Sequence, residues 1–176
     1  MEILYIALGT MLVFLLYYRI IVPVQTHKKM IKLLSPLEEL GYILTVEKNK
    51  PYQYALESQN SLFLIAVCKI PSNSTVTINS KDTWSLTWGG NPRNKGRAYH
   101  NQRYLTELTP FLRSEFKFDK PTEKLIILYP STENILRYLN ESELELVLPN
   151  AKPYGYRVLR ASTLFENFKE IEGGLQ

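Results

Sequence analysis

The sequence predicts an α/β protein, in which an N-terminal transmembrane helix precedes one domain built on a central mixed sheet flanked by helices. Three observations carry this prediction. An uncharged apolar run opens the chain, β-rich runs bounded by turn residues follow from residue 42 onward, and segments with helical spacing stand before, between and after them. Strand and helix signals mixed in this way are typical of helices packed on a sheet.

The N-terminal run has the length of a membrane span. Residues 3–18 carry no charged side chain, and beyond Arg19 the apolar sequence continues to Val24. A helix needs about 20 mostly apolar residues to cross a bilayer, so residues 1–25 are predicted to form a transmembrane anchor and residues 26–176 the folded domain. A cleaved signal peptide is disfavoured, because the chain starts with Glu2 rather than a basic residue and lacks a small-residue cleavage site after the run.

The basic residues around this span predict its orientation. None precedes the run, and four follow it: Arg19, Lys28, Lys29 and Lys32. Because positive charge is enriched on the cytoplasmic side, we expect a single-pass membrane protein with its N-terminus outside and its C-terminal domain in the cytoplasm. Tyr17, Tyr18 and Arg19 should then mark the inner interface. Lys28 and Lys29 should lie near anionic lipid headgroups.

The first half of the domain is predicted to be a helix followed by five strands. Apolar residues recur at three-residue steps in 27–40, which is typical of a helix, with a break near Pro36 and a stop at Gly41. Strands are predicted at 42–46, 52–57 and 62–70. The third is apolar throughout, so we expect it at the centre of the sheet and covered on both faces. Two β-rich segments, 75–79 and 83–87, predict a hairpin.

The second half is predicted to alternate helices and strands. The Gly89-Gly90-Asn91-Pro92 segment breaks the chain before a long helix predicted at 94–111. A buried strand at 125–129, a short helix at 133–139 and strands at 144–148 and 156–161 follow. A final helix is predicted from Ser162 onward, with that serine as its cap.

At this level the chain resembles the nuclease-related domain family. The resemblance covers residues 37–171. It rests on the segment LFLIAVCK at 62–69, the hairpin containing Trp84, the Asn91-Pro92 pair and the predicted helix with His100 and Gln102. It implies a restriction-endonuclease-like fold. Enzymes of that fold hold Mg²⁺ with converging carboxylates, and a lysine positions the water that attacks the phosphodiester.

The resemblance also implies which positions would carry that chemistry. The family places an acid on the second strand and an acid-x-Lys on the third. These positions fall on or near Tyr54, on Val67 and on Lys69, and the family's first-helix Glu falls near His27 or Lys28. Only the lysine is retained, so the resemblance implies an inactive nuclease fold with no metal and no cofactor.

The acids of a metal site could instead have moved to other positions. Glu57 is the best replacement on the second strand, but its spacing from Tyr54 predicts that it points to the opposite face. Asp82 lies in a turn, where Asp is common for local backbone reasons. Ordinary solvent-exposed positions are predicted for Glu38, Glu39 and Glu47. An active Mg²⁺-dependent nuclease with relocated carboxylates is therefore the minority interpretation.

Other catalytic chemistries find little support. The 2 histidines and 1 cysteine leave no zinc-binding pattern. No glycine-rich phosphate loop follows a strand. Cys68 is expected in a central strand, where burial would make its thiol unreactive, and a lone cysteine agrees with a reducing compartment.

Two non-enzymatic functions remain. The first is a scaffold or docking subunit that holds protein partners in a larger membrane complex. The second is a membrane tether that binds DNA or RNA without cleaving it. Candidate binding residues for either are Arg93, Lys95, Arg97, His100, Arg103 and Trp88, because interfaces favour Trp, Tyr and Arg and nucleic acid attracts basic side chains. The net charge of +4 is modest, and the basic cluster is equally compatible with a solvated helix start.

Overall fold

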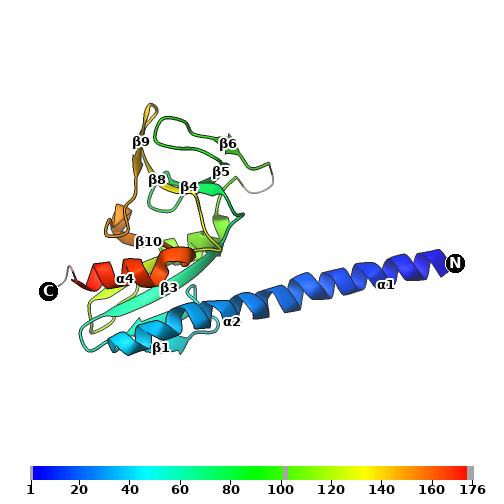
Figure 1. The fold of residues 1–176 in the computed structure, drawn as a ribbon, viewed down its shortest axis with the longest axis horizontal. Helices are drawn as coiled ribbons and strands as arrows, with labels where there is room; N and C mark the ends of the chain where they lie inside the picture. The colour runs from blue at the N-terminus through cyan, green and yellow to red at the C-terminus, as the bar shows by residue number, and fades with distance from the viewer. Residues whose placement is uncertain (1, 101–102, 174–176) are drawn as a thin grey trace.

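The computed structural model describes residues 2–100 and 103–173 (Figure 1). Its helical segments are α1 (Glu2–Leu16), the π-helical turn η1 (Tyr17–Ile21), α2 (Val22–Leu34), η2 (Ser35–Leu40), η3 (Thr106–Leu108), α3 (Thr109–Arg113), η4 (Pro153–Gly155), η5 (Ala161–Thr163) and α4 (Leu164–Gly173). Its strands are β1 (Ile43–Val46), β2 (Tyr54–Glu57), β3 (Leu62–Lys69), β4 (Ser74–Ile78), β5 (Trp84–Trp88), β6 (Arg97–Ala98), β7 (Thr122–Tyr129), β8 (Asn134–Asn140), β9 (Glu143–Leu146) and β10 (Tyr156–Arg160).

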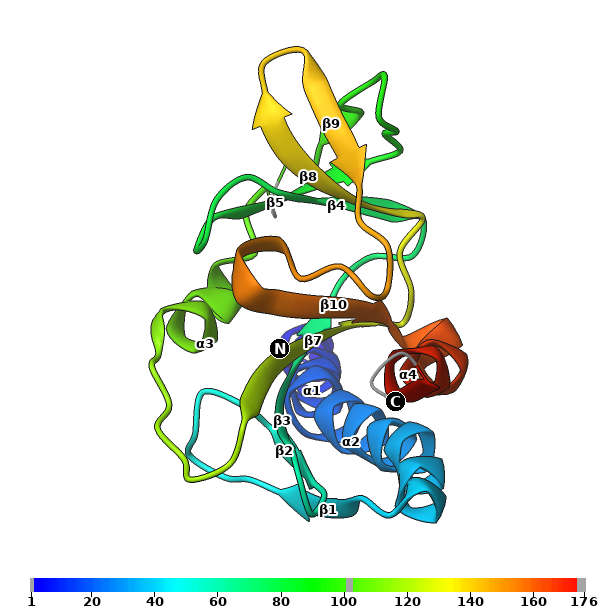
Figure 2. The ribbon, with the colours of Figure 1, turned by 90° about the vertical axis from the view of Figure 1, so that its left-hand side faces the viewer.

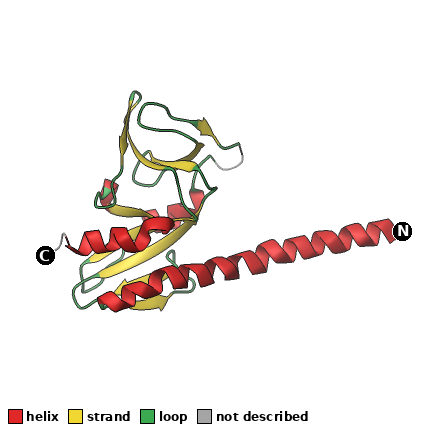
Figure 3. Cartoon of the chain, in the orientation of Figure 1, coloured by secondary structure: helices red, strands yellow, loops and turns green. Residues whose placement is uncertain are grey.

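The N-terminal helix projects from the rest of the protein. Segments α1, η1 and α2 form one unbroken helix, whose N-terminal part extends away from the domain (Figures 1 and 3). The π-helical turn ends two residues before Pro23, which lacks the backbone N–H that a regular α-helix would use there. The helix is long and apolar enough to span a membrane, and its apolar window is not buried by the domain. Its C-terminal end is anchored, because Met30 and Leu34 are buried in the core.

The first sheet has the strand order β1-β2-β3-β7-β10. Strands β1, β2 and β3 form an antiparallel meander, whereas β7 pairs in parallel with β3 and β10 in parallel with β7. Alternate side chains of β3 point to opposite faces. Phe63 and Ile65 pack with α2 and α4, while Leu64, Ala66 and Cys68 join the core on the other face. The prediction of a central, doubly covered third strand is thus confirmed.

The expectation of one central sheet is wrong, because the residues that the structure describes form two five-stranded sheets. The second has the order β6-β5-β4-β8-β9 and includes the predicted β4–β5 hairpin. A parallel pair needs a long crossover. Strands β4–β6 lie in the crossover from β3 to β7, and β8–β9 in the crossover from β7 to β10. Because β4 pairs with β8, the two crossovers assemble into the second sheet beside the first (Figure 2).

The helix predicted at 94–111 is also wrong. The described part of this segment contains the short strand β6, the turn η3 and the short helix α3, while Gln102 lies outside the described residues. Gly96 has a φ of +69°, and a Cβ built there would lie 2.6 Å from the Gly89 carbonyl oxygen. The backbone at Gly96 therefore lies very close to the backbone at Gly89. The positive φ is incompatible with a helix at this position, and the close contact favours glycine.

The short helix predicted at 133–139 is instead strand β8. Its residues pair with β4 on one side and with β9 on the other. The local sequence fits a helix, but the partner strands decide the conformation, because a strand here satisfies backbone groups on both of its neighbours. The last predicted helix appears as η5 followed by α4, close to its expected start.

Candidate functional site

A concavity lies where α2 crosses the C-terminal end of β3. It has a volume of about 480 Å³ and is lined by α2, the β1–β2 turn, β2, β3 and η3. We call it the α2–β3 cavity. Its chemically relevant side chains are His27, Glu47, Lys48, Tyr54, Lys69 and Glu107.

The structure brings the positions implied by the family resemblance to this one cavity. Val67 and Lys69 are two residues apart on β3, so both side chains point to the face covered by α2. On the neighbouring strand, Tyr54 pairs opposite Ile65 and points to the same face. His27 reaches the cavity from α2, whereas Lys28 is exposed and does not line it.

His27 and Tyr54 form a direct contact across the cavity wall. The His27 Nδ1 and the Tyr54 hydroxyl lie 2.7 Å apart, and the two rings stack with 14° between their planes. Burial raises the pKa of the Tyr54 hydroxyl, so this group keeps its proton at neutral pH and can donate to a neutral imidazole. Where the resemblance implies metal-binding acids, the cavity therefore holds the hydrogen-bonded His27–Tyr54 pair and the isopropyl group of Val67.

Two carboxylates do line the cavity, and each has a partner. Glu47 forms an ion pair with Lys50 at 2.9 Å. Glu107 accepts a hydrogen bond from the Cys68 thiol at 3.1 Å. Burial, followed by the charge of Glu107, raises the pKa of Cys68 well above its usual value, which keeps the thiol protonated and unreactive. Within the described residues, no three His, Cys, Asp or Glu side chains gather as a metal site.

Sequence reasoning missed Glu107, because it placed this residue inside a long helix. In the structure Glu107 belongs to the turn η3, which lies beside β3. The sequence carries no signal for this placement, because only the fold of the β3–β7 crossover brings η3 to the cavity.

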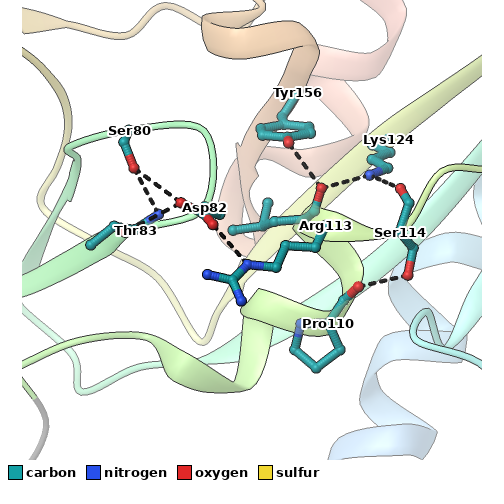
Figure 4. Close-up of polar contacts among 9 residues, drawn as sticks. Ser80, Asp82, Thr83, Pro110, Arg113, Ser114, Lys124 and Tyr156 are labelled. Atoms are coloured by element: carbon teal, nitrogen blue, oxygen red, sulfur yellow. Dashed lines mark hydrogen bonds and ion pairs between the residues drawn. The ribbon is translucent and has the colours of Figure 1, made fainter.

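The other acids considered as relocated ligands lie elsewhere. Glu57 pairs opposite Leu62, at the far end of the β2–β3 pair from Lys69, and its carboxylate contacts Lys120 at 2.5 Å. Asp82 lies in the β4–β5 turn and accepts a hydrogen bond from Arg113 Nε at 2.7 Å (Figure 4). Neither residue lines the α2–β3 cavity.

Figure 4 also shows a second polar cluster, which is structural. The Lys124 ammonium donates to the backbone carbonyls of Phe111, Leu112 and Ser114 at 2.9, 2.9 and 2.5 Å. Figure 4 shows the contact with Ser114. These are the free carbonyls at the end of α3, which a cation satisfies well. Desolvation lowers the pKa of Lys124. With its three donors occupied, this lysine caps a helix and is not available to a ligand.

The basic residues singled out from the sequence lie on the second sheet and its loops. Arg93, Lys95, Arg97, His100 and Arg103 are exposed, and they lie in loops and an edge strand rather than on the predicted helix. Lys95 and Arg103 line a groove of about 360 Å³, where they lie over the rings of Tyr138 and Tyr104. Trp88 is 60% exposed and contacts Tyr99. None of these residues lines the α2–β3 cavity.

The residues predicted at the membrane interface lie along the N-terminal helix. Tyr17, Tyr18 and Arg19 belong to the π-helical turn, and Lys28 and Lys29 are exposed on α2. The structure places them in order along one helix but does not fix which side of a membrane they face. The predicted orientation stays a prediction.

No family model, curated protein or solved structure matched this chain. The likeness to nuclease-related domains therefore rests on the chain's own residues.

Proposed function

We propose that the protein is a membrane-anchored, catalytically inactive domain with a nuclease-related fold, which serves as a scaffold or docking subunit of a membrane-associated complex. The observation that carries this proposal is the composition of the α2–β3 cavity. It retains Lys69 but presents His27, Tyr54 and Val67 at the positions where the family resemblance implies acids.

The chemistry of the cavity supports the absence of cleavage. Mg²⁺ prefers several oxygen ligands in octahedral geometry, usually including carboxylates. Val67 offers no ligand, and His27 and Tyr54 are hydrogen-bonded to each other and supply no carboxylate. Glu47 and Glu107 are held by Lys50 and Cys68. A lysine alone can neutralise a phosphate charge, but it cannot place a metal-activated water beside it.

The helix and the exposed surface support a docking function. The unbroken helix joins an apolar segment directly to the core through Met30 and Leu34, so a span in the membrane would hold the domain close to the bilayer. Edge strand β1 exposes Ile43 and Val46, and Trp88 is exposed on the second sheet. Exposed sheet edges and large aromatic residues are common features of protein interfaces.

The first test is a nuclease assay on the full-length protein in detergent. Single- and double-stranded DNA and RNA should remain intact with Mg²⁺ or Mn²⁺. Cleavage that disappears in Lys69→Ala would contradict the proposal, because it would show a working site around this lysine.

The second test asks what binds. After gentle detergent extraction and affinity purification, we expect stoichiometric protein partners that survive nuclease treatment and moderate salt. Ile43→Lys on the β1 edge and Trp88→Ala on the second sheet should weaken capture if either surface docks a partner. Recovery of nucleic acid alone would refute the scaffold.

The groove on the second sheet favours one alternative function, a membrane tether for DNA or RNA. Lys95, Arg103, Tyr104 and Tyr138 combine charge with stacking surfaces, and no Asp or Glu is among the residues that line this groove. Such surfaces bind single strands without reading sequence. Replacing Arg93, Lys95 and Arg97 by alanine should then weaken binding and reduce its salt dependence. The slope of log binding constant against log salt concentration should become shallower by about 0.7–0.9 for each phosphate that is no longer neutralised.

A further inference from the structure

The α2–β3 cavity lies close to the end of the apolar helix segment. An α-helix rises about 1.5 Å per residue, so Pro23 and His27 stand about 6 and 12 Å beyond Arg19 along the axis. The headgroup layer adds about 5–7 Å to each side of the hydrocarbon core. With Arg19 at the edge of the hydrocarbon core, the α2 residues that line the cavity begin at the depth of the headgroups with Pro23 and continue to Met30, about 16 Å beyond Arg19.

The fold turns the cavity toward the same side. The cavity lies at the C-terminal end of β3, and β3 runs toward the side of the domain from which α1 extends (Figure 1). Because α1, η1 and α2 form one unbroken helix and Met30 packs in the core, the projecting helix is continuous with one wall of the cavity. A bilayer around α1 would have the cavity at its surface.

The cavity walls suit a phosphate attached to an apolar body. Lys48 and Lys69 are exposed cations that line the cavity from the β1–β2 turn and from β3, and Tyr54 and His27 also line it. Glu47 is neutralised by Lys50, which leaves Glu107 as the remaining opposing charge. Lysine ammonium groups form short charge-assisted hydrogen bonds with phosphate oxygens. Pro23, Met30 and Val46 supply apolar contact for a glycerol backbone.

We propose that the α2–β3 cavity binds the phosphate-bearing headgroup of one anionic phospholipid from the leaflet at which the helix leaves the membrane. Lys48 and Lys69 contact the phosphate, and the apolar wall near Pro23 contacts the glycerol end. The bound lipid would hold the domain in one orientation on the bilayer. This inference rests on the membrane anchoring within the proposed function, but not on the scaffold function.

The test measures lipid that stays bound to the full-length protein. The protein is reconstituted in nanodiscs of phosphatidylcholine and phosphatidylglycerol, released into mild detergent and examined by native mass spectrometry. The wild-type protein should retain one phosphatidylglycerol. Because each charged hydrogen bond contributes substantially to binding, Lys48→Ala/Lys69→Ala should reduce retention by at least about tenfold. The conservative Lys69→Arg should keep most of it.

A matched control removes two cations from the other end of the molecule. Lys95→Ala/Arg103→Ala changes the net charge equally without touching the cavity, so it should retain lipid like the wild type. Circular dichroism and Tm of both variants exclude unfolding as the cause. Equal loss in both variants would show general charge attraction and overturn the specific site. The specific site would also be overturned if both variants retained as much lipid as the wild type, or if the wild-type protein retained no lipid.

Two further arms separate the remaining outcomes. Glycerol 3-phosphate carries the same phosphate without acyl chains, so a lipid site should bind it more weakly than phosphatidylglycerol; equal or tighter binding of glycerol 3-phosphate would identify a soluble phosphate ligand and overturn the lipid assignment. Resistance of the protein to alkaline carbonate extraction tests the anchor independently. A protein that stays in the membrane but retains no lipid refutes only this inference, whereas a protein released by carbonate refutes the anchoring in the proposed function.

Discussion

Helix α4 should be held to the first sheet mainly by one aromatic side chain, Phe168. Its exposed fraction is 0%, and its ring packs edge-on against Phe63 and Tyr42 with centroid distances of 5.1 and 5.3 Å. The same cluster holds Met30 of α2, so this packing also supports the wall of the α2–β3 cavity. Phe168→Ala removes this ring and leaves a cavity, because the surrounding structure can relax only partly into the space.

The expected magnitude follows from this burial. Phe→Ala in a core costs about 3–5 kcal/mol, which includes the cavity left behind. For a domain of this size, each kcal/mol lowers Tm by about 2–4 °C, so we expect a decrease of about 6–20 °C. The measurement is thermal unfolding of the full-length protein in one detergent, monitored by near-ultraviolet circular dichroism.

Phe165 provides the matched control on the same helix. It is only half-buried, with Lys169 lying over its ring at 4.5 Å. Phe165→Ala makes the same change in helix propensity but removes much less buried surface, so it should cost about 1 kcal/mol or less. Equal effects of the two substitutions would refute the packing of α4 described above.

Three further predictions concern single contacts. The hydrogen bond from Arg113 lowers the pKa of Asp82 below 3.8; a carboxyl with a depressed folded pKa stabilises the fold above its unfolded pKa and loses that contribution as the pH falls through the folded value. Arg113→Ala should therefore raise the Asp82 pKa in an NMR titration, and an unchanged value would contradict the ion pair. Cys68 should resist maleimide labelling at pH 8 in the folded protein and react once urea unfolds it; rapid labelling of the folded protein would show that the thiol is not buried. Gly96→Ala should destabilise the β5–β6 loop by about 1–3 kcal/mol, because it combines a positive φ with a contact at 2.6 Å. Gly155→Ala, with a φ of +82° and no atom within 4 Å, is the control for φ alone, and an equal cost in urea unfolding would rule out the steric clash.

The local pattern of the sequence was enough to predict most strands. The β1–β3 meander, the β4–β5 hairpin and β7 agree with their predicted segments to within a few residues. These segments carry apolar or β-branched residues bounded by turn signals, which are local features. The helices predicted at 94–111 and 133–139 were wrong, since these segments have local helical features but pair or pack with distant strands.

The candidate site could be predicted only in part. The positions of Tyr54, Val67 and Lys69 relative to one another follow from strand alternation and pairing. The contact of His27 with Tyr54 requires the angle at which α2 crosses the sheet, and the approach of Glu107 requires the path of the β3–β7 crossover. Neither the angle nor the path leaves a pattern in the local sequence.

The sequence by itself determined the apolar N-terminal helix, the α/β class and the apolar central strand, because each depends on the type and spacing of neighbouring residues. Only the tertiary structure decided that the crossover segments form a second sheet and that a cavity joins α2, β2, β3 and η3. The physical reason is that strand pairing and helix docking satisfy backbone groups and bury side chains that are far apart in the chain, and those gains outweigh local preferences.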